Sequence, residues 1–211
     1  MQYFKLKKTK KITNIEISIL FGLITAILMS FFGCLKQTEN LEKNVLRLHI
    51  LANSNSKEDQ SVKLKVRDEI LKNFDFNTYN NDINKSKQKI RSELKKIEAV
   101  AKKTLKKEGF DDSVKASLEK TYFDTREYKD FSMPAGVYDA LKIEIGNAKG
   151  KNWWCVMVPS MCVPAASEKQ KAINTFNDGE KDLITKGNKA EIRFKSIEIF
   201  KNIFSLRRKF D

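Results

Sequence analysis

The side chains best suited to chemistry are two cysteines seven positions apart, Cys155 and Cys162, and the only histidine, His49. Outside the cytoplasm, two thiols this close in the chain, with Pro159 between them, favour a disulfide. A free Cys155 thiolate beside the His49 imidazole would instead form a nucleophilic pair, which is the chemistry of a hydrolase. Because the choice depends on the compartment, both interpretations stay open at this point.

Other patterns that carry chemistry are missing from the sequence. It has no cluster of histidines for a metal, no Cys-x-x-Cys pair and no glycine-rich phosphate loop. Carboxylates say nothing about acid–base catalysis, because some pair can always be found among 27 acidic residues. We therefore expect no metal, no cofactor and no small-molecule substrate, and predict that the protein is not an enzyme.

Both tryptophans, Trp153 and Trp154, directly precede Cys155. The apolar run 153–158 is short, rich in aromatic and β-branched residues and stopped by Pro159, which predicts a strand. Adjacent strand residues point to opposite faces, so one indole ring would enter the core and the other would lie on the second face. Alternatively, one ring stays partly exposed as an anchor for a partner. We expect the other elements to pack around this strand.

The formal net charge of +14 is unevenly placed. Five lysines and no acidic residue occur among the first eleven residues, which leaves +9 for the remainder. Only seven of the 41 basic residues are arginine, whereas bidentate recognition of phosphates and bases favours arginine. We therefore expect no nucleic-acid partner, although a basic surface also suits adhesion to anionic lipid or wall polymer.

A segment without any charge, residues 17–35, follows the lysine-rich start. As a helix it would rise about 28 Å, which is close to the hydrocarbon thickness of a bilayer. The order of charges predicts a signal peptide or transmembrane anchor over residues 1–36, with the N-terminus in the cytoplasm. Residues 37–211 would then form an extracytoplasmic domain.

The next two elements are a strand and a helix. Residues 45–52 predict a strand with Leu46, Leu48 and Ile50 on one face and Arg47 and His49 on the other. Ser56 and Asp59 resemble a capping box for a helix over residues 57–73. Three charged residues fall inside the apolar arc of this helix. Asp59 can pair with Lys63, while Arg67 either reaches a partner or extends along the edge of the core.

The rest of the chain predicts one longer helix and several strands. The helix covers residues 83–108 and ends at Gly109. Alternating residues predict strands at 114–122 and 141–145, a hairpin loop at 147–151 leading into the tryptophan strand, and helical stretches over 165–211 with a strand near 191–194. The fold class is α+β: an N-terminal hydrophobic helix, then one domain with an antiparallel or mixed sheet and two helices packed on one face.

Two groups of residues carry a resemblance to a known family. Residues 47–56, which read Arg-Leu-His-Ile-Leu-Ala-Asn-Ser-Asn-Ser, and then residues 59–60 and 65–68, resemble the first signature of the stage II sporulation protein R family of endospore-forming bacteria. Residues 134–141 and 152–156, the latter Asn-Trp-Trp-Cys-Val, resemble its second signature. The similarity extends over about residues 45–163. Ala148 departs from the family, which has a glycine at this place in the hairpin.

The resemblance implies a protein exported from the forespore into the space between the two membranes of a sporulating cell. There the family activates a membrane-embedded aspartic protease, which cleaves the precursor of sigma-E. The candidate partner-binding residues are Arg47, His49, Asn53, Lys63, Arg67, Tyr138, Asn152, Trp153 and Trp154. An extracytoplasmic hydrolase using Cys155 and His49, and a basic adhesion module, remain as alternatives.

Overall fold

The computed structural model describes residues 14–74, 82–128, 131–159, 161–162 and 173–185 of the chain. Four helices and six strands within these residues carry the fold. They are α1 (Asn14–Asn44), β1 (Leu46–Leu51), α2 (Lys57–Asn73), α3 (Ile83–Lys107), β2 (Val114–Phe123), β3 (Arg126–Glu127), β4 (Ser132–Met133), β5 (Gly136–Ile145), β6 (Asn152–Val158) and α5 (Asp178–Thr185).

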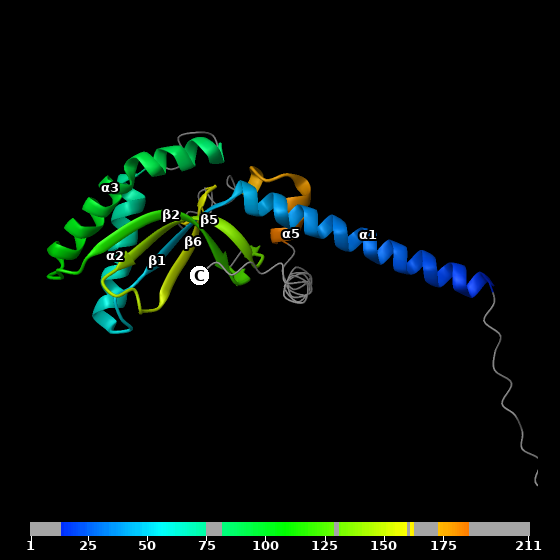
Figure 1. Ribbon diagram of the computed structural model, residues 1–211, viewed down its shortest axis with the longest axis horizontal. Helices are drawn as coiled ribbons and strands as arrows, with labels where there is room; N and C mark the ends of the chain where they lie inside the picture. The colour runs from blue at the N-terminus through cyan, green and yellow to red at the C-terminus, as the bar shows by residue number, and fades with distance from the viewer. Residues whose placement is uncertain (1–13, 75–81, 129–130, 160, 163–172, 186–211) are drawn as a thin grey trace, which may run out of the picture.

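The centre of the domain is a mixed four-stranded sheet with the strand order β2-β5-β1-β6 (Figure 1). Strand β1 runs parallel to β5 and antiparallel to β6, and β2 pairs antiparallel with β5. Strands β3 and β4 form a separate small hairpin. The predicted α+β class with a mixed sheet is confirmed.

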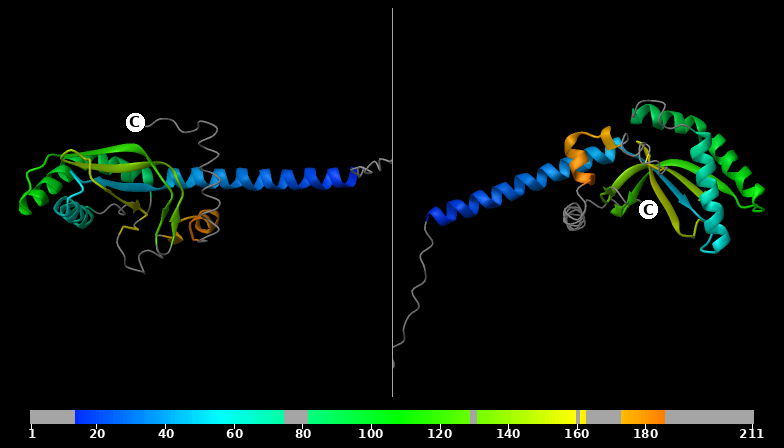
Figure 2. Two further views of the ribbon diagram at one scale, coloured as in Figure 1. Left: turned by 90° about the horizontal axis from the view of Figure 1, so that it is seen from below. Right: turned by 180° about the vertical axis from the view of Figure 1, so that it is seen from behind.

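Helices α2 and α3 lie together on one face of the sheet, at the end of the molecule away from α1 (Figures 1 and 2). Their apolar residues pack against the side chains on one face of the sheet and form a continuous core with them. This core includes Val62, Val66 and Ile70 of α2, Ile90, Ile97 and Leu105 of α3, and Leu48, Ile50, Leu141 and Ile143 of the sheet. The prediction of two helices on one face is therefore confirmed.

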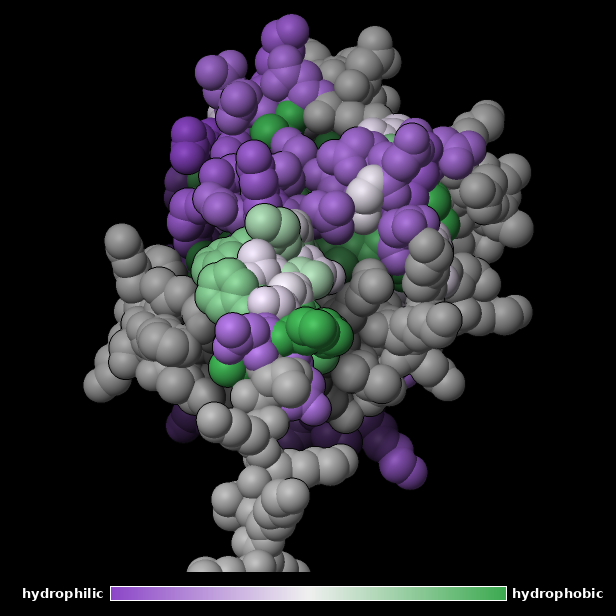
Figure 3. All heavy atoms as spheres, turned by 90° about the vertical axis from the view of Figure 1, so that its right-hand side faces the viewer, coloured by the Kyte–Doolittle hydropathy of each residue, from purple (hydrophilic) through white to green (hydrophobic). Residues whose placement is uncertain are grey.

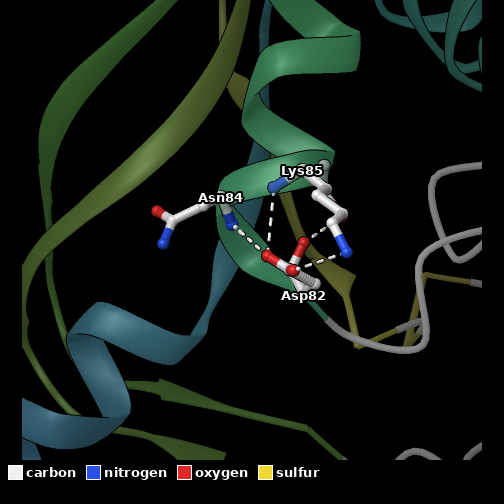
Figure 4. Close-up of polar contacts among 4 residues, drawn as sticks. Asp82, Asn84 and Lys85 are labelled. Carbon is white, nitrogen blue, oxygen red and sulfur yellow. Dashed lines mark hydrogen bonds and ion pairs between the residues drawn. The ribbon is translucent and has the colours of Figure 1, made fainter.

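The start of α3 shows why this helix begins where it does. Asp82 is its N-cap, and the Oδ1 atom accepts hydrogen bonds of 3.1 Å from the backbone N–H groups of Asn84 and Lys85 (Figure 4). These groups have no partner inside the helix, so the carboxylate stabilises the first turn. The bond from the Lys85 amide is the main reason that the pKa of Asp82 lies below its usual value.

A second core lies on the opposite face of the sheet. It contains Leu41 at the end of α1, Leu183 and Ile184 of α5, and Phe131, Met133, Tyr138 and Val156. Helix α1 is thus attached to the domain by its C-terminal turns. The predicted boundary between residues 36 and 37 falls inside this helix, where Thr38 is already buried.

The N-terminal part of α1 projects away from the domain and carries exposed apolar side chains. They include Ile15, Ile19, Phe21, Leu23 and Met29. In Figure 3, which looks from the side toward which α1 extends, hydrophobic residues gather in the middle of the view. By length and composition α1 is able to cross a membrane, and a signal sequence would have the same properties.

Two expectations about the tryptophan strand are wrong. Strand β6 lies at the edge of the sheet, so the other elements do not pack around it; β1 and β5 are the central strands. The predicted hairpin between β5 and β6 does not form, because β1 lies between them and pairs with both. Residues 146–151 instead cross the end of β1.

This crossing is held by the turn that follows β1. The Asn53 side chain accepts a 3.0 Å hydrogen bond from the Asn147 N–H, and the Asn55 side chain accepts one of 2.7 Å from the Lys151 N–H. The Gly150 N–H donates to the Ala52 carbonyl at 2.8 Å. Two segments far apart in sequence are thereby fixed against each other.

The predicted start of α2 is correct, but its polar pairs differ from those expected. The Ser56 hydroxyl accepts from the Asp59 N–H at 3.0 Å, as in a capping box. The Asp59 carboxylate does not return to Ser56. It accepts from the Asn53 side chain at 3.2 Å, so the expected pair with Lys63 is wrong.

The remaining predicted elements agree with the structure where it describes them. The bounds of α2 match residues 57–73, and α3 ends one residue before the predicted 108. Strands β2 and β5 contain the predicted segments. Helix α5 lies within the C-terminal region expected to be helical, whereas the predicted strand near 191–194 falls outside the described residues.

The crossing gives a first prediction. A Cβ atom at Gly150 would overlap the Ser54 carbonyl oxygen, so Gly150→Ala should destabilise the domain by about 1–3 kcal/mol. The measurement is denaturant unfolding of the full-length protein in detergent.

Ala148 provides the matched control in the same connection. Its φ of 53° lies in the left-handed region that favours glycine, so Ala148→Gly should leave stability unchanged or raise it by less than about 1 kcal/mol. Equal destabilisation by both substitutions would contradict the crossing as described.

Candidate functional site

Cys155 and Cys162 form a disulfide, with their Cα atoms 5.2 Å apart. Cys155 pairs with Leu48 across the sheet and lies in the core beneath α2 and α3. His49 pairs with Trp154, and its ring contacts Phe123 on the opposite face. A nucleophilic pair of Cys155 and His49 is therefore excluded, because the thiol is bonded and the two side chains point to opposite faces.

The disulfide folds the chain back onto the end of β6. The Met161 N–H donates to the Val156 carbonyl at 3.1 Å, and the Cys162 sulfur also contacts this carbonyl oxygen. Met161 is buried in the second core. The disulfide loop is consequently a packed part of the domain.

A structural disulfide makes a clear prediction. Cys155→Ser and Cys162→Ser should destabilise the protein equally, by about 2.5 kcal/mol in the chain-entropy treatment of such a short loop. Thermal unfolding of each variant, compared with the double variant, measures this. A large loss of function in Cys155→Ser alone, with Cys162→Ser as active as the parent, would contradict it.

The second face of the sheet carries a cluster of aromatic rings around a buried charge. Arg47 is fully buried, and its guanidinium lies 4.0 Å from the ring centre of Phe123 and 5.0 Å from that of Tyr138. Its Nη2 atom donates to the Tyr128 hydroxyl at 3.3 Å. The faces of aromatic rings attract cations, so these contacts compensate in part for the lost hydration of Arg47.

Tyr138 and Trp154 fix the two ends of this cluster. The Tyr138 hydroxyl donates to the Pro134 carbonyl at 2.7 Å, and burial raises the pKa of this phenol. The Trp154 ring contacts His49 and Phe123, with ring centres 5.7 and 6.0 Å away. The guanidinium of Arg126 lies 3.8 Å above the Trp154 ring. The signature residues of three strands, β1, β5 and β6, thus meet in one packed group.

His49 titrates abnormally in this group. Burial, the largest cause, lowers the pKa of His49 from 6.5 to about 4. The side chain is neutral at pH 7, where it acts as an aromatic packing residue. Its protonation in the folded protein would place a second positive charge near Arg47.

The lowered pKa predicts a pH-dependent stability. Between about pH 4 and 6.5 the unfolded chain binds more protons at His49 than the folded chain does, so stability falls as the pH falls through this window. The loss in the free energy of unfolding between pH 7 and pH 4.5 should be about 2–3 kcal/mol smaller in His49→Phe than in the parent protein. The carboxylates titrate alike in both proteins and so contribute equally to the two losses. Unfolding curves at pH 7 and pH 4.5 provide the test; parallel losses in both proteins would contradict it.

The first face presents a different arrangement at the same strand. The Arg67 guanidinium lies 4.3 Å from the ring centre of Trp153 and pairs with Asp68 at 2.6 Å. Lys63 is buried, and its ammonium group donates to the Gln60 side chain at 2.6 Å and to the Lys151 carbonyl at 2.8 Å. Burial and the positive charge of Arg67 lower the pKa of Lys63.

The predicted partner-binding residues therefore occupy three kinds of position. Arg47, His49, Lys63 and Tyr138 are buried, and Asn53 holds the crossing over β1. Trp153, Trp154 and Arg67 are half-buried around β6, and Asn152 at the start of this strand is exposed. As the sequence predicted, the two indole rings lie on opposite faces.

Sequence reasoning missed Arg126, Phe123 and Tyr128. Phe123 ends β2 and contacts four residues of the signatures, and Arg126 covers Trp154 from the short strand β3. A single arginine in a two-residue strand has no periodic pattern that would place it. Phe123 lies on the other face of β2 from Tyr122, and the prediction of this strand rested on the alternating residues of the Tyr122 face alone.

A hollow between α2 and α3, with a volume of about 480 Å³, lies apart from these residues. Its lining is largely charged and includes Lys65, Asp68, Lys103 and Glu108, without any histidine or cysteine. Among the described residues, no group of histidine, cysteine and acidic side chains is arranged to hold a metal ion. The arrangement around β6 remains the part of the molecule in which the signature residues meet.

Comparison with known proteins identifies the family. A family model described as stage II sporulation protein R matches residues 42–168. The chain belongs to the stage II sporulation protein R family. The matched range begins in the last turn of α1 and contains the four-stranded sheet, α2, α3 and the disulfide loop. The part of the chain that matches the family model is therefore the sheet domain that carries β6.

A curated relative supports the same assignment. The chain is 42% identical over 120 residues to "Stage II sporulation protein R" of Bacillus subtilis (strain 168). The match covers 56% of this chain and 53% of the relative, so it spans about half the length of each. No solved structure matches the chain.

Membership of the stage II sporulation protein R family identifies a sporulation protein. Its apolar N-terminal helix is suited to a signal or an anchor, and the Cys155–Cys162 disulfide is typical of proteins outside the cytoplasm. Both features agree with membrane association and an extracytoplasmic domain.

Proposed function

We propose that this protein is an exported signalling protein that activates a membrane-embedded aspartic protease, which then processes the precursor of sigma-E during endospore formation. Family membership supports the role in sporulation. The observation that carries the proposal is the arrangement at β6, where signature residues are packed into a partly exposed surface without a catalytic constellation among the described residues.

The apolar N-terminal part of the chain supports export. Residues 1–36 act as a signal peptide or anchor, and residues 37–211 form the domain in the intermembrane space after secretion from the forespore. The continuity of α1 into the buried Leu41 favours an anchor that stays attached, because the helix contributes to the second core. The domain would then be held close to a membrane.

The contact surface for the protease consists of Asn152, Trp153, Trp154, Arg67 and Arg126, which we call the β6 surface. Each tryptophan ring is covered on one side by a guanidinium, at 4.3 Å for Trp153 and 3.8 Å for Trp154. Tryptophan and arginine supply much of the binding energy at protein interfaces. The buried residues Arg47, His49 and Tyr138 act indirectly, by holding Trp154 and the strands in place.

Activation requires that the β6 surface binds one state of the protease better than the other. Such differential binding shifts the population toward the favoured state, by a factor set by the ratio of the two affinities. A non-enzymatic activator needs a rigid surface for this purpose. The disulfide loop and the crossing over β1 provide that rigidity.

The proposal is tested by co-expressing the protein, the protease and the sigma-E precursor in a host that does not sporulate, with cleavage followed by immunoblot. Trp153→Ala and Trp154→Ala should each lower cleavage at least tenfold, since loss of a central interface aromatic costs about 2 kcal/mol or more. Lys95→Ala is the control, because this exposed side chain lies on α3, away from β6.

The outcome that would contradict the proposal is unchanged cleavage by both tryptophan variants, with their folding confirmed by circular dichroism. A basic adhesion module predicts a different pattern. Its function would fall with general reduction of positive charge and would not depend on either tryptophan.

A further inference from the structure

The outer edge of β6 is open over part of its length. The Val156 carbonyl accepts from the Met161 N–H, so this group points away from β1. Backbone groups alternate in direction along an antiparallel strand, and therefore the N–H and C=O groups of Asn152 and Trp154 point outward as well. In the described part of the chain they have no backbone partner.

We propose that an extended, acidic segment of the partner protease pairs with this open edge as a further strand of the sheet. The inference rests on the proposed function and deepens it, because it assigns the kind of segment that binds and the way it binds. Addition of a strand to an exposed sheet edge is a general form of peptide recognition, in which main-chain hydrogen bonds supply affinity and neighbouring side chains supply specificity.

One end of the open edge is closed. At Val156 the disulfide loop occupies the edge through Met161 and Cys162. Exposed edges are normally protected against pairing with other chains. Within the residues that the structure describes, the protection stops short of Asn152 and Trp154, which leaves two donors and two acceptors for a short segment.

The positively charged side chains beside the open edge favour a negatively charged segment. An added strand would direct alternate side chains to the two faces of the sheet, next to Trp153 with Arg67 on one face and Trp154 with Arg126 on the other. Among the described residues, Arg126 pairs with no carboxylate, and its Nε atom is buried without a hydrogen-bond partner.

Lysines add to this positive charge. In the described part of the chain, the partners of the Lys63 ammonium group are the Gln60 side chain and the Lys151 carbonyl, neither of which carries a negative charge. The Lys151 residue itself is exposed. Acidic side chains on the added segment would complement Arg126 on one face and Lys63 and Lys151 on the other, where Arg67 already pairs with Asp68. Opposite charges across neighbouring strands are stabilising.

Asn152 allows the backbone edge to be tested separately from the side chains. Asn152→Pro removes the outward N–H and places ring atoms where an added strand must approach, without removing a bond between β6 and β1. Asn152→Ala is the matched control, because it alters the side chain and keeps the N–H. In the co-expression assay, cleavage should be at least tenfold lower with Asn152→Pro than with Asn152→Ala, because only the proline variant removes the outward N–H.

The charge is tested in the same assay with Arg126. Arg126→Glu should lower cleavage at least tenfold, and Arg126→Lys should retain most of it. Full activity of Arg126→Glu would overturn the acidic character of the segment.

The other outcomes are equally decisive. If Asn152→Pro is as active as the parent, or if Asn152→Ala loses activity to the same extent, the backbone edge is not the binding site and the inference is wrong, while the proposed function stands. If the parent protein gives no cleavage, the proposed function itself fails. If Asn152→Pro converts a dimer of the purified protein into a monomer, the edge binds a second copy, and the acidic segment is overturned.

Amide hydrogen exchange tests the same edge in the parent protein, without any substitution. With detergent-solubilised protease added to the full-length protein, the Asn152 and Trp154 amides should exchange at least tenfold more slowly. Unchanged exchange at both amides in the presence of bound protease would overturn the inference.

Discussion

The structure depends on the burial of β1 between two strands and two cores. Because β1 pairs with β5 on one side and β6 on the other, its alternate side chains must supply both faces of the sheet. Leu48 and Ile50 enter the core beneath α2 and α3, whereas Arg47 and His49 enter the aromatic group around Phe123. The same arrangement forces the connection from β5 to β6 across the end of β1, and this crossing uses the asparagines of the following turn.

The position of β6 connects this architecture to the proposed function. As an edge strand it has one side held by β1 and the other side directed outward. Each of its two tryptophan rings packs against one of the two cores and is covered by a guanidinium, that of Arg67 for Trp153 and that of Arg126 for Trp154. The disulfide loop closes the end of the strand. A surface that is rigid before binding loses little conformational entropy on association, which suits a protein that acts by favouring one state of a partner.

Local features were predictable from the sequence, and neighbour relations were not. The bounds of α2 follow from the Ser56 cap and its apolar spacing, and β6 follows from its aromatic run and Pro159. The hairpin prediction failed because two alternating segments joined by a short loop look the same whether or not a third strand enters between them. The burial of Arg47 also could not be foreseen, since the rings that compensate its charge come from Phe123 and Tyr138, far along the chain.

We propose that the protein activates the protease from outside the cytoplasm. The most direct measurement compares precursor cleavage by the full chain with cleavage by a chain that begins at residue 37 and stays in the cytoplasm, both at equal abundance beside the protease. Activation from outside should give cleavage with the full chain only, and recovery when an unrelated signal peptide directs the shortened chain out of the cytoplasm. Equal cleavage by the retained chain, or none by either exported form, would contradict it.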